Sequence, residues 1–77
     1  MALSSSDVIS HKGFALLLLP QDAGGFTVHG KRQGGGFFSV QGSNHSTDHF
    51  DTMVFADQGE AMAEAKAIAE TATILSR

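Results

Sequence analysis

The sequence of 77 residues is long enough for one small domain and too short for two. It contains no cysteine, which excludes disulfide bonds and thiolate metal ligands, and its five basic and eight acidic residues give a net charge of −3, the wrong sign for a protein that binds nucleic acid directly. No apolar run approaches the roughly 18 residues of a membrane span, and residues 1–10 lack the basic start of a secretory signal. We therefore expect a single cytoplasmic domain, residues 1–77, that does not associate with membranes.

The N-terminal residues 1–12 carry no strong pattern. Three serines at positions 4–6 favour turns, because their hydroxyl groups bond to the nearby backbone. Residues 7–10 can either extend the first strand backwards or lie along the surface, and both alternatives stay open. The segment as a whole is a candidate for flexibility.

An antiparallel hairpin is predicted next. Residues 14–19 are all apolar and end at Pro20, and the residue before a proline favours the extended geometry of a strand end. Residues 21–25 include two glycines, which adopt the positive φ angles that turns require. Residues 26–29 then alternate apolar and polar side chains, as in a half-buried strand. These two runs predict a hairpin with a five-residue loop.

Two further extended segments follow the hairpin. Glycines at 34–36 come after two basic residues, which is compatible with a phosphate-binding nest, but they lie between two strands, where a β-turn or bulge is favoured. Residues 37–41 predict a short third strand, residues 42–49 a polar loop, and residues 50–55 a fourth extended segment.

A C-terminal helix over residues 58–75 is the strongest prediction. Asp57 is a good N-cap, and Glu60 follows at the capping-box spacing, which satisfies two backbone N–H groups. The segment is rich in alanine, the best helix former. Its apolar stripe consists of Ala61, Met62, Ala65, Ile68, Ala69, Ala72 and Leu75. The order of elements predicts an α+β fold, a three- or four-stranded antiparallel sheet with one C-terminal helix packed on one face.

The predicted sheet has more apolar surface than one helix can cover. Residues 14–19 are apolar on both sides of their strand, which is typical of a sheet that is buried on both faces. We expect the uncovered surface to mark an interface with a partner or a second copy. Folding of residues 1–12 over it is the alternative, which their small apolar area does not favour. The expected surface consists of Leu16, Leu18, Phe37, Met53 and Phe55.

His45, Asp48, His49 and Asp51 form the most site-like group of side chains in the sequence. Two imidazoles with two nearby carboxylates can hold Zn²⁺ or another divalent ion. The spacing of the histidines places them on one side only in a helix, whereas the preceding Gly-Ser-Asn sequence indicates a loop. We therefore favour a solvated loop and expect no metal and no cofactor.

Acidic side chains are concentrated in the second part of the chain. Residues 44–77 carry a net charge of −4, whereas residues 1–43 carry +1. The candidates for partner binding among them are Asp48, Asp51, Asp57, Glu60 and Glu64. They can present an acidic face to a basic partner, and an ordinary solvated helix face is the simpler interpretation.

The order of elements resembles that of two families of small proteins with a short sheet and one helix. The matching pieces are residues 14–19, the Gly-Gly-Phe-Thr-Val segment at 24–28 and the acidic, alanine-rich helix start at 57–69. One family is the HicB-like antitoxins, whose Pro-Gly-Cys-like segment before the helix is missing here. The other is the phage-encoded anti-CRISPR proteins of similar length. The resemblance implies a βββα topology, and no functional residue is carried over from it.

We expect a small non-enzymatic protein that binds a protein partner and inhibits or modulates it. In its sharpest form this is an anti-CRISPR-like inhibitor, whose acidic or apolar surface blocks a basic nucleic-acid-binding complex. The alternative is a homodimeric antitoxin-like or housekeeping binding module. We expect no enzymatic activity, because the sequence contains no ordered set of acid, base and nucleophile, and a chain of this length encloses little space for a pocket.

Overall fold

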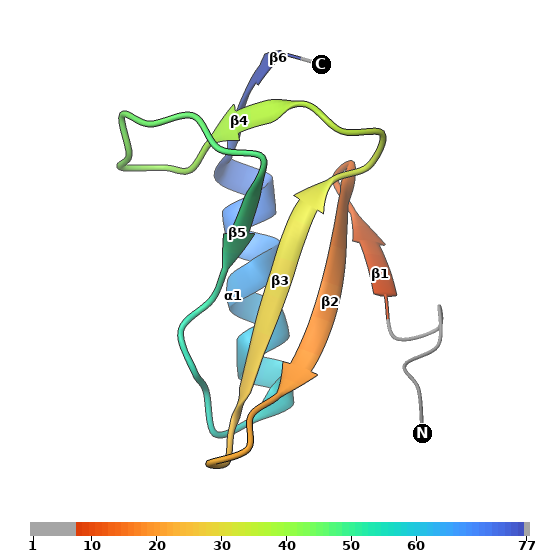
Figure 1. Ribbon diagram of the computed structural model, residues 1–77, viewed down its shortest axis with the longest axis vertical. Helices are drawn as coiled ribbons and strands as arrows, with labels where there is room; N and C mark the ends of the chain where they lie inside the picture. The colour runs from red at the N-terminus through yellow and green to blue at the C-terminus, as the bar shows by residue number, and fades with distance from the viewer. Residues whose placement is uncertain (1–7, 77) are drawn as a thin grey trace.

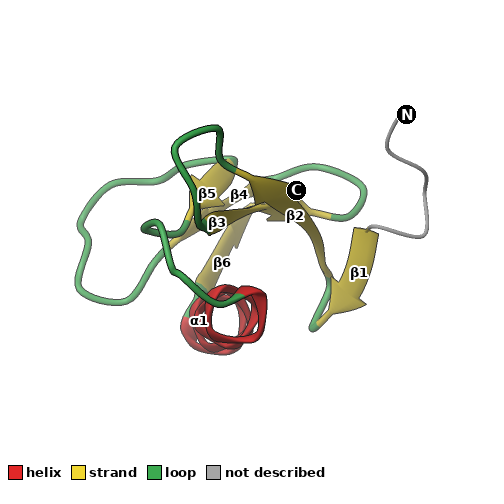
Figure 2. Cartoon of the chain, turned by 90° about the horizontal axis from the view of Figure 1, so that it is seen from below, coloured by secondary structure: helices red, strands yellow, loops and turns green. Residues whose placement is uncertain are grey.

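The computed structural model describes residues 8–76, which form two antiparallel sheets and one helix (Figure 1). In chain order the elements are β1 (Val8–His11), β2 (Phe14–Pro20), β3 (Phe26–Arg32), β4 (Phe37–Ser39), β5 (His49–Asp51), α1 (Gln58–Thr71) and β6 (Thr73–Ser76). The main sheet has the strand order β1-β2-β3-β5, and β4 pairs with β6 in a second sheet. Helix α1 lies on one face of the main sheet (Figure 2). The predicted α+β fold, with a four-stranded antiparallel sheet and one helix, is confirmed.

The hairpin of β2 and β3 forms as the sequence predicts. The pairing ends with Pro20 opposite Phe26, so residues 21–25 make the five-residue loop. Gly25 in this loop has a φ angle of 89°, and a Cβ atom there would lie 2.6 Å from the side chain of Val54. Both its backbone conformation and the close approach of the next segment therefore require a glycine at this position.

The segment before this hairpin forms a strand of its own. β1 folds back on β2, with His11 opposite Phe14, so neither an extension of β2 nor a loose surface segment describes residues 8–11. The connecting residues Lys12 and Gly13 both have positive φ angles, 53° and 81°, as tight two-residue hairpin turns require. The predicted serine turn at residues 4–6 lies outside the described residues.

Helix α1 begins where the sequence predicts and ends earlier. The Asp57 carboxylate accepts a hydrogen bond from the N–H of Glu60 at 3.0 Å, so the predicted N-cap is confirmed. The helix ends at Thr71 rather than at residue 75, because Ala72 is extended and the β-branched pair Thr73 and Ile74 joins β6. The last two members of the predicted stripe, Ala72 and Leu75, therefore lie outside the helix. Among residues 8–76 no helix is long and apolar enough to cross a membrane.

The core lies between α1 and the sheet. Its buried side chains are Phe14, Leu16, Val28, Phe38, Phe50, Ala61, Ala65 and Ala69. The rings of Phe14 and Phe38 meet edge to face, with centroids 4.8 Å apart. Gly30 lies beneath Phe50, and a Cβ atom at this glycine would lie 2.4 Å from the Phe50 ring. The small alanines on α1 and the glycine in β3 let helix, sheet and phenylalanine rings pack closely.

The third and fourth predicted strands differ from expectation in extent and place. β4 is confined to residues 37–39 and pairs with β6 in the second sheet, not with the main sheet. β5 ends at Asp51, and beyond it the predicted segment 50–55 bonds to β3 at Thr52, whose N–H donates to the C=O of Val28, and at Phe55, which bridges Phe26. Thr52 marks the departure from the sheet, because its buried hydroxyl accepts the N–H of Val28.

The prediction that Leu16 lies on an uncovered apolar surface is wrong. Leu16 is fully buried in the core, and Leu18 and Phe55 pack against that core. The side of β2 that carries Leu16 and Leu18 faces α1, so it is the covered side. Phe37 and Met53 are exposed, at 49% and 74%, but they lie in β4 and in the segment between β5 and α1.

Candidate functional site

A groove of about 400 Å³ runs between α1 and β5. It is lined by Val40, Gln41, Phe50, Asp51, Glu64, Ala67, Ile68 and Thr71. Phe50 is almost completely buried, and Val40 and Ile68 are partly buried against the core, so the floor of the groove is apolar. No lysine or arginine is among the lining residues. The groove therefore combines an apolar floor with the carboxylate of Glu64 and no basic side chain.

One side of α1 forms the wall of this groove. Glu64 and Ile68 are four residues apart, and Thr71 is three residues further on, so all three lie along the same side of the helix. The same spacing continues towards the N-terminus through Glu60 to Asp57 at the N-cap. We call Asp57, Glu60 and Glu64 the acidic stripe. The stripe extends the acidic end of the groove by two helical turns.

The members of the acidic stripe are exposed, and within residues 8–76 none of them forms an ion pair. The only hydrogen bond described for their carboxylates is the capping bond of Asp57. The predicted reciprocal bond from the Glu60 side chain to the N-cap backbone is not formed among the described residues. The carboxylates of Glu60 and Glu64 are therefore available to basic groups of another molecule.

The remaining candidate carboxylates are engaged differently. Asp51 pairs with His29 at 2.9 Å and Asp48 pairs with His49 at 2.8 Å. The predicted acidic surface therefore divides into the acidic stripe on the helix and two carboxylates that already have histidine partners.

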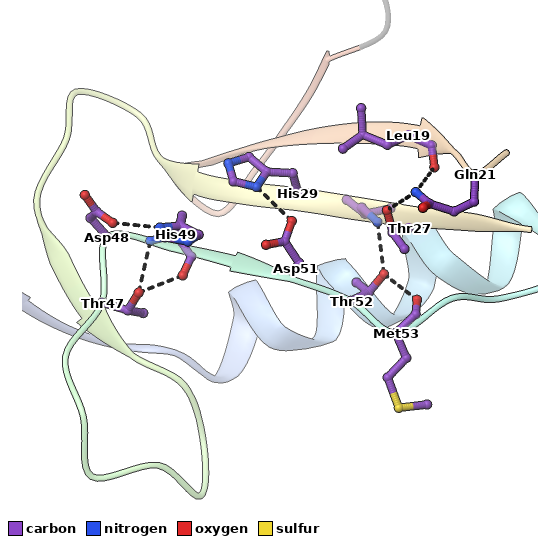
Figure 3. A network of polar contacts seen from close by, with 11 residues as sticks. Leu19, Gln21, Thr27, His29, Thr47, Asp48, His49, Asp51, Thr52 and Met53 are labelled. Carbon is purple, nitrogen blue, oxygen red and sulfur yellow. Dashed lines mark hydrogen bonds and ion pairs between the residues drawn. The ribbon is translucent and has the colours of Figure 1, made fainter.

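These two pairs form a polar cluster on the sheet face that points away from α1 (Figure 3). His29 alternates with the buried Val28 and Gly30 along β3, so its side chain points to the open face. The rings of His29 and His49 stack, with centroids 5.4 Å apart. Together with Lys31 and Asp48 the two rings line a hollow of about 150 Å³.

The pairing sets the protonation pattern of the cluster. A carboxylate can only accept a hydrogen bond, so each ring carries its proton on Nδ1, which faces the aspartate. The hydrogen bond from His49 lowers the pKa of Asp48 below its ordinary value. Desolvation opposes this effect, and the charges of His49 and Lys31 lower the pKa further. The cluster is half-exposed, so water screens these interactions.

The structure does not bring the predicted metal-binding group together. His45 lies exposed in the loop, where its N–H donates to the Ser43 hydroxyl, whereas Asp48 and Asp51 pair with different histidines. Within the described part of the chain, no three or more side chains of the metal-binding types share a possible site. His29 belongs to the polar cluster but is not among the site residues that the sequence predicts. Its alternation along residues 26–29 indicates an outward side chain, but only the pairing of β3 with β5 brings it to Asp51.

Comparison of the chain with protein-family models, with curated proteins and with solved structures finds no match. The resemblance to HicB-like antitoxins and anti-CRISPR proteins therefore stays a prediction. The functional argument rests on the groove, the acidic stripe and the polar cluster.

Proposed function

We propose that this protein is a non-enzymatic binding protein that inhibits or modulates a basic, nucleic-acid-binding protein partner in the cytoplasm. The single observation that supports the proposal most is the apolar groove between α1 and β5, which continues into an acidic stripe without ion-pair partners. Such a surface suits a partner that presents an apolar side chain beside lysine or arginine.

The two parts of the surface contribute differently to binding. The apolar floor supplies affinity, because apolar area that leaves water stabilises a complex by about 25 cal/mol per Å² before the costs of association. The carboxylates steer a basic partner and select it over acidic ones. Lysine and arginine that bind these carboxylates are withdrawn from nucleic-acid phosphates, which accounts for inhibition.

We assign no catalytic activity to the polar cluster. Its histidines are 33% and 54% exposed, so bulk water reaches both rings. Catalysis by charge stabilisation needs groups that are held in a water-excluded site. The expectation of a non-enzymatic protein is therefore kept as part of the proposal.

The test is affinity capture with a matched charge control. In the variant Glu60→Lys/Glu64→Lys the acidic stripe is reversed while the Asp57 cap is kept. The control Asp22→Lys/Glu70→Lys has the same net charge but changes two exposed residues outside the groove. Because Glu70 pairs with His11 at 2.7 Å, the single control Asp22→Lys is run beside it. We expect the wild type and the control to capture the same basic protein from the native host, and the stripe variant to lose it.

The captured protein must then lose nucleic-acid binding when purified wild-type protein is added, as measured by a gel-shift titration. Capture by all three forms alike, or unchanged nucleic-acid binding, would contradict the proposal.

The alternative is a homodimer, and one observation favours it. β1 is an edge strand whose Val8 and Ile9 are 42% and 39% exposed, and free sheet edges tend to pair with other strands. Light scattering at micromolar concentration distinguishes the two. A monomer mass supports the binding protein, and twice that mass supports the homodimeric module.

A further inference from the structure

Ile68, Glu64 and Glu60 stand at regular intervals along the α1 side of the groove and its acidic stripe. This spacing determines which basic segments can bind there. We infer that the groove takes an extended segment in which one large apolar residue and two basic residues stand at alternate positions. This inference rests on the proposed function and names the kind of segment that the surface recognises.

The first step is the distance along the helix wall. Ile68, Glu64 and Glu60 follow one another at four-residue intervals on one side of α1. Four residues of an α-helix rise about 6 Å. Two residues of an extended strand advance about 6.6 Å and bring the next side chain to the same side. Alternate side chains of an extended segment therefore meet Ile68, Glu64 and Glu60 in turn.

The volume of the groove limits how much of a partner it can hold. An α-helix is about 10 Å across, so a partner helix as long as this stretch occupies roughly 1000 Å³. The groove offers about 400 Å³. The hollow therefore has room for the apolar side chain and a few backbone atoms of an extended segment, but it does not enclose a whole helix.

The third step is the chemistry of the two ends. The floor beneath Ile68 is formed by Phe50 and Val40, which suits an apolar side chain. The wall at Glu64 and the stripe at Glu60 carry carboxylates without ion-pair partners among the described residues. Charge complementarity therefore requires lysine or arginine at the next two alternate positions of the segment after the apolar residue.

The segment is held by side chains rather than by addition to β5. The hydroxyl of Thr47 accepts the N–H of His49 at 3.4 Å and donates to its C=O at 2.9 Å, so this part of the β5 edge already has partners. Recognition thus depends on which residues the segment carries and on their spacing.

The test uses short fluorescent peptides of equal composition and the full chain at low salt. One peptide carries leucine, lysine and lysine at alternate positions between serines, a second carries the same pattern reversed, and the control carries leucine and both lysines consecutively. We expect one alternating peptide to bind about tenfold tighter than the consecutive control, because only alternate residues share one side of an extended chain.

Matched variants locate the binding. Glu64→Gln removes a groove carboxylate and should weaken the alternating peptide about fivefold, as expected for one exposed ion pair. Asp22→Asn removes one exposed carboxylate in the hairpin loop outside the groove, which has no ion-pair partner among the described residues, and should leave binding unchanged. Circular dichroism checks that both variants keep the helix.

Equal binding of alternating and consecutive peptides, or no binding of any of them, overturns the inference about spacing. An equal loss with Glu64→Gln and Asp22→Asn overturns the location. If the stripe variant Glu60→Lys/Glu64→Lys still loses the captured basic protein in such a case, the proposed function stands without this mode of recognition.

Discussion

The two faces of the main sheet differ in almost every physical property. The face towards α1 carries large apolar side chains that are fully buried, such as Phe14, Leu16 and Val28. The opposite face carries the polar cluster with His29 and Asp51, whose side chains remain in contact with water. The comparison indicates that the stability of this small domain comes from one face, and that the other face and the helix wall are free to serve recognition.

The sharpest test of this difference uses two neighbouring leucines of β2. Leu16→Ala should lower the free energy of unfolding by about 3 kcal/mol, because it leaves a cavity in the core. Leu17→Ala makes the same change on the open, half-buried face and should cost about 1 kcal/mol or less. Urea denaturation followed by circular dichroism measures both. Equal losses would mean that the two faces contribute alike.

A second test adds volume to the covered face. Gly30→Ala places a methyl group 2.4 Å from the Phe50 ring and 3.0 Å from Leu16, so overpacking should destabilise the protein by about 2 kcal/mol. Adding Phe50→Leu should recover part of that loss, because it relieves the contact. The same denaturation assay compares the double variant with Phe50→Leu alone. Independent, additive effects would contradict a steric cause.

A third test acts on the helix that covers this face. Asp57→Ala removes the bond to the N–H of Glu60 and should destabilise the protein by about 1 kcal/mol. Asp57→Asn keeps a capping oxygen and serves as the control, with little expected change. Thermal denaturation should rank wild type and Asp57→Asn together above Asp57→Ala. A deficit shared by both variants would assign the effect to charge instead of capping.

The smallest effect is expected on the open face. The hydrogen bond from His49 holds the pKa of Asp48 below its ordinary value of 3.8. A carboxyl with a lowered folded pKa adds stability above the ordinary value, and that stability is lost as the pH falls through the folded pKa. Carbon-detected NMR titration should show the pKa of Asp48 rising towards 3.8 in His49→Ala. An identical titration in both proteins would exclude the hydrogen bond as the cause.

Local chemistry made part of the fold predictable. The hairpin loop at residues 21–25 and the helix start at Asp57 depend on residues within a few positions of each other. Patterns of this short range can be read from the sequence because glycine turns and N-caps act on their own neighbours.

Long-range pairing made the rest unpredictable. Thr73 and Ile74 follow an alanine-rich helix, and only their pairing with β4, far earlier in the chain, turns them into a strand. The covered face of β2 could not be chosen either, because both of its sides are apolar.

The candidate site divides in the same way. The acidic stripe follows from the spacing of Asp57, Glu60 and Glu64 within one helix. The groove does not, because Val40 and Phe50 reach it from separate segments. The pairing of His29 with Asp51 likewise depends on the register between β3 and β5.

The pairing of β4 with β6 has a consequence for how the protein folds and opens. These strands close a loop that contains β5 and the whole of α1, the longest loop closed by any strand pairing in the described chain, so their pairing carries a high cost in loop-closure entropy. Pairings of this kind form late in folding, and weakly buried ones open first in the native state. Phe38 anchors β4 in the core, whereas Ile74 of β6 is 44% exposed and adds little burial to hold β6 in place. Amide hydrogens of β6 should therefore exchange with solvent before those of β2 and β3, and β6 can separate while β4 and the main sheet stay intact.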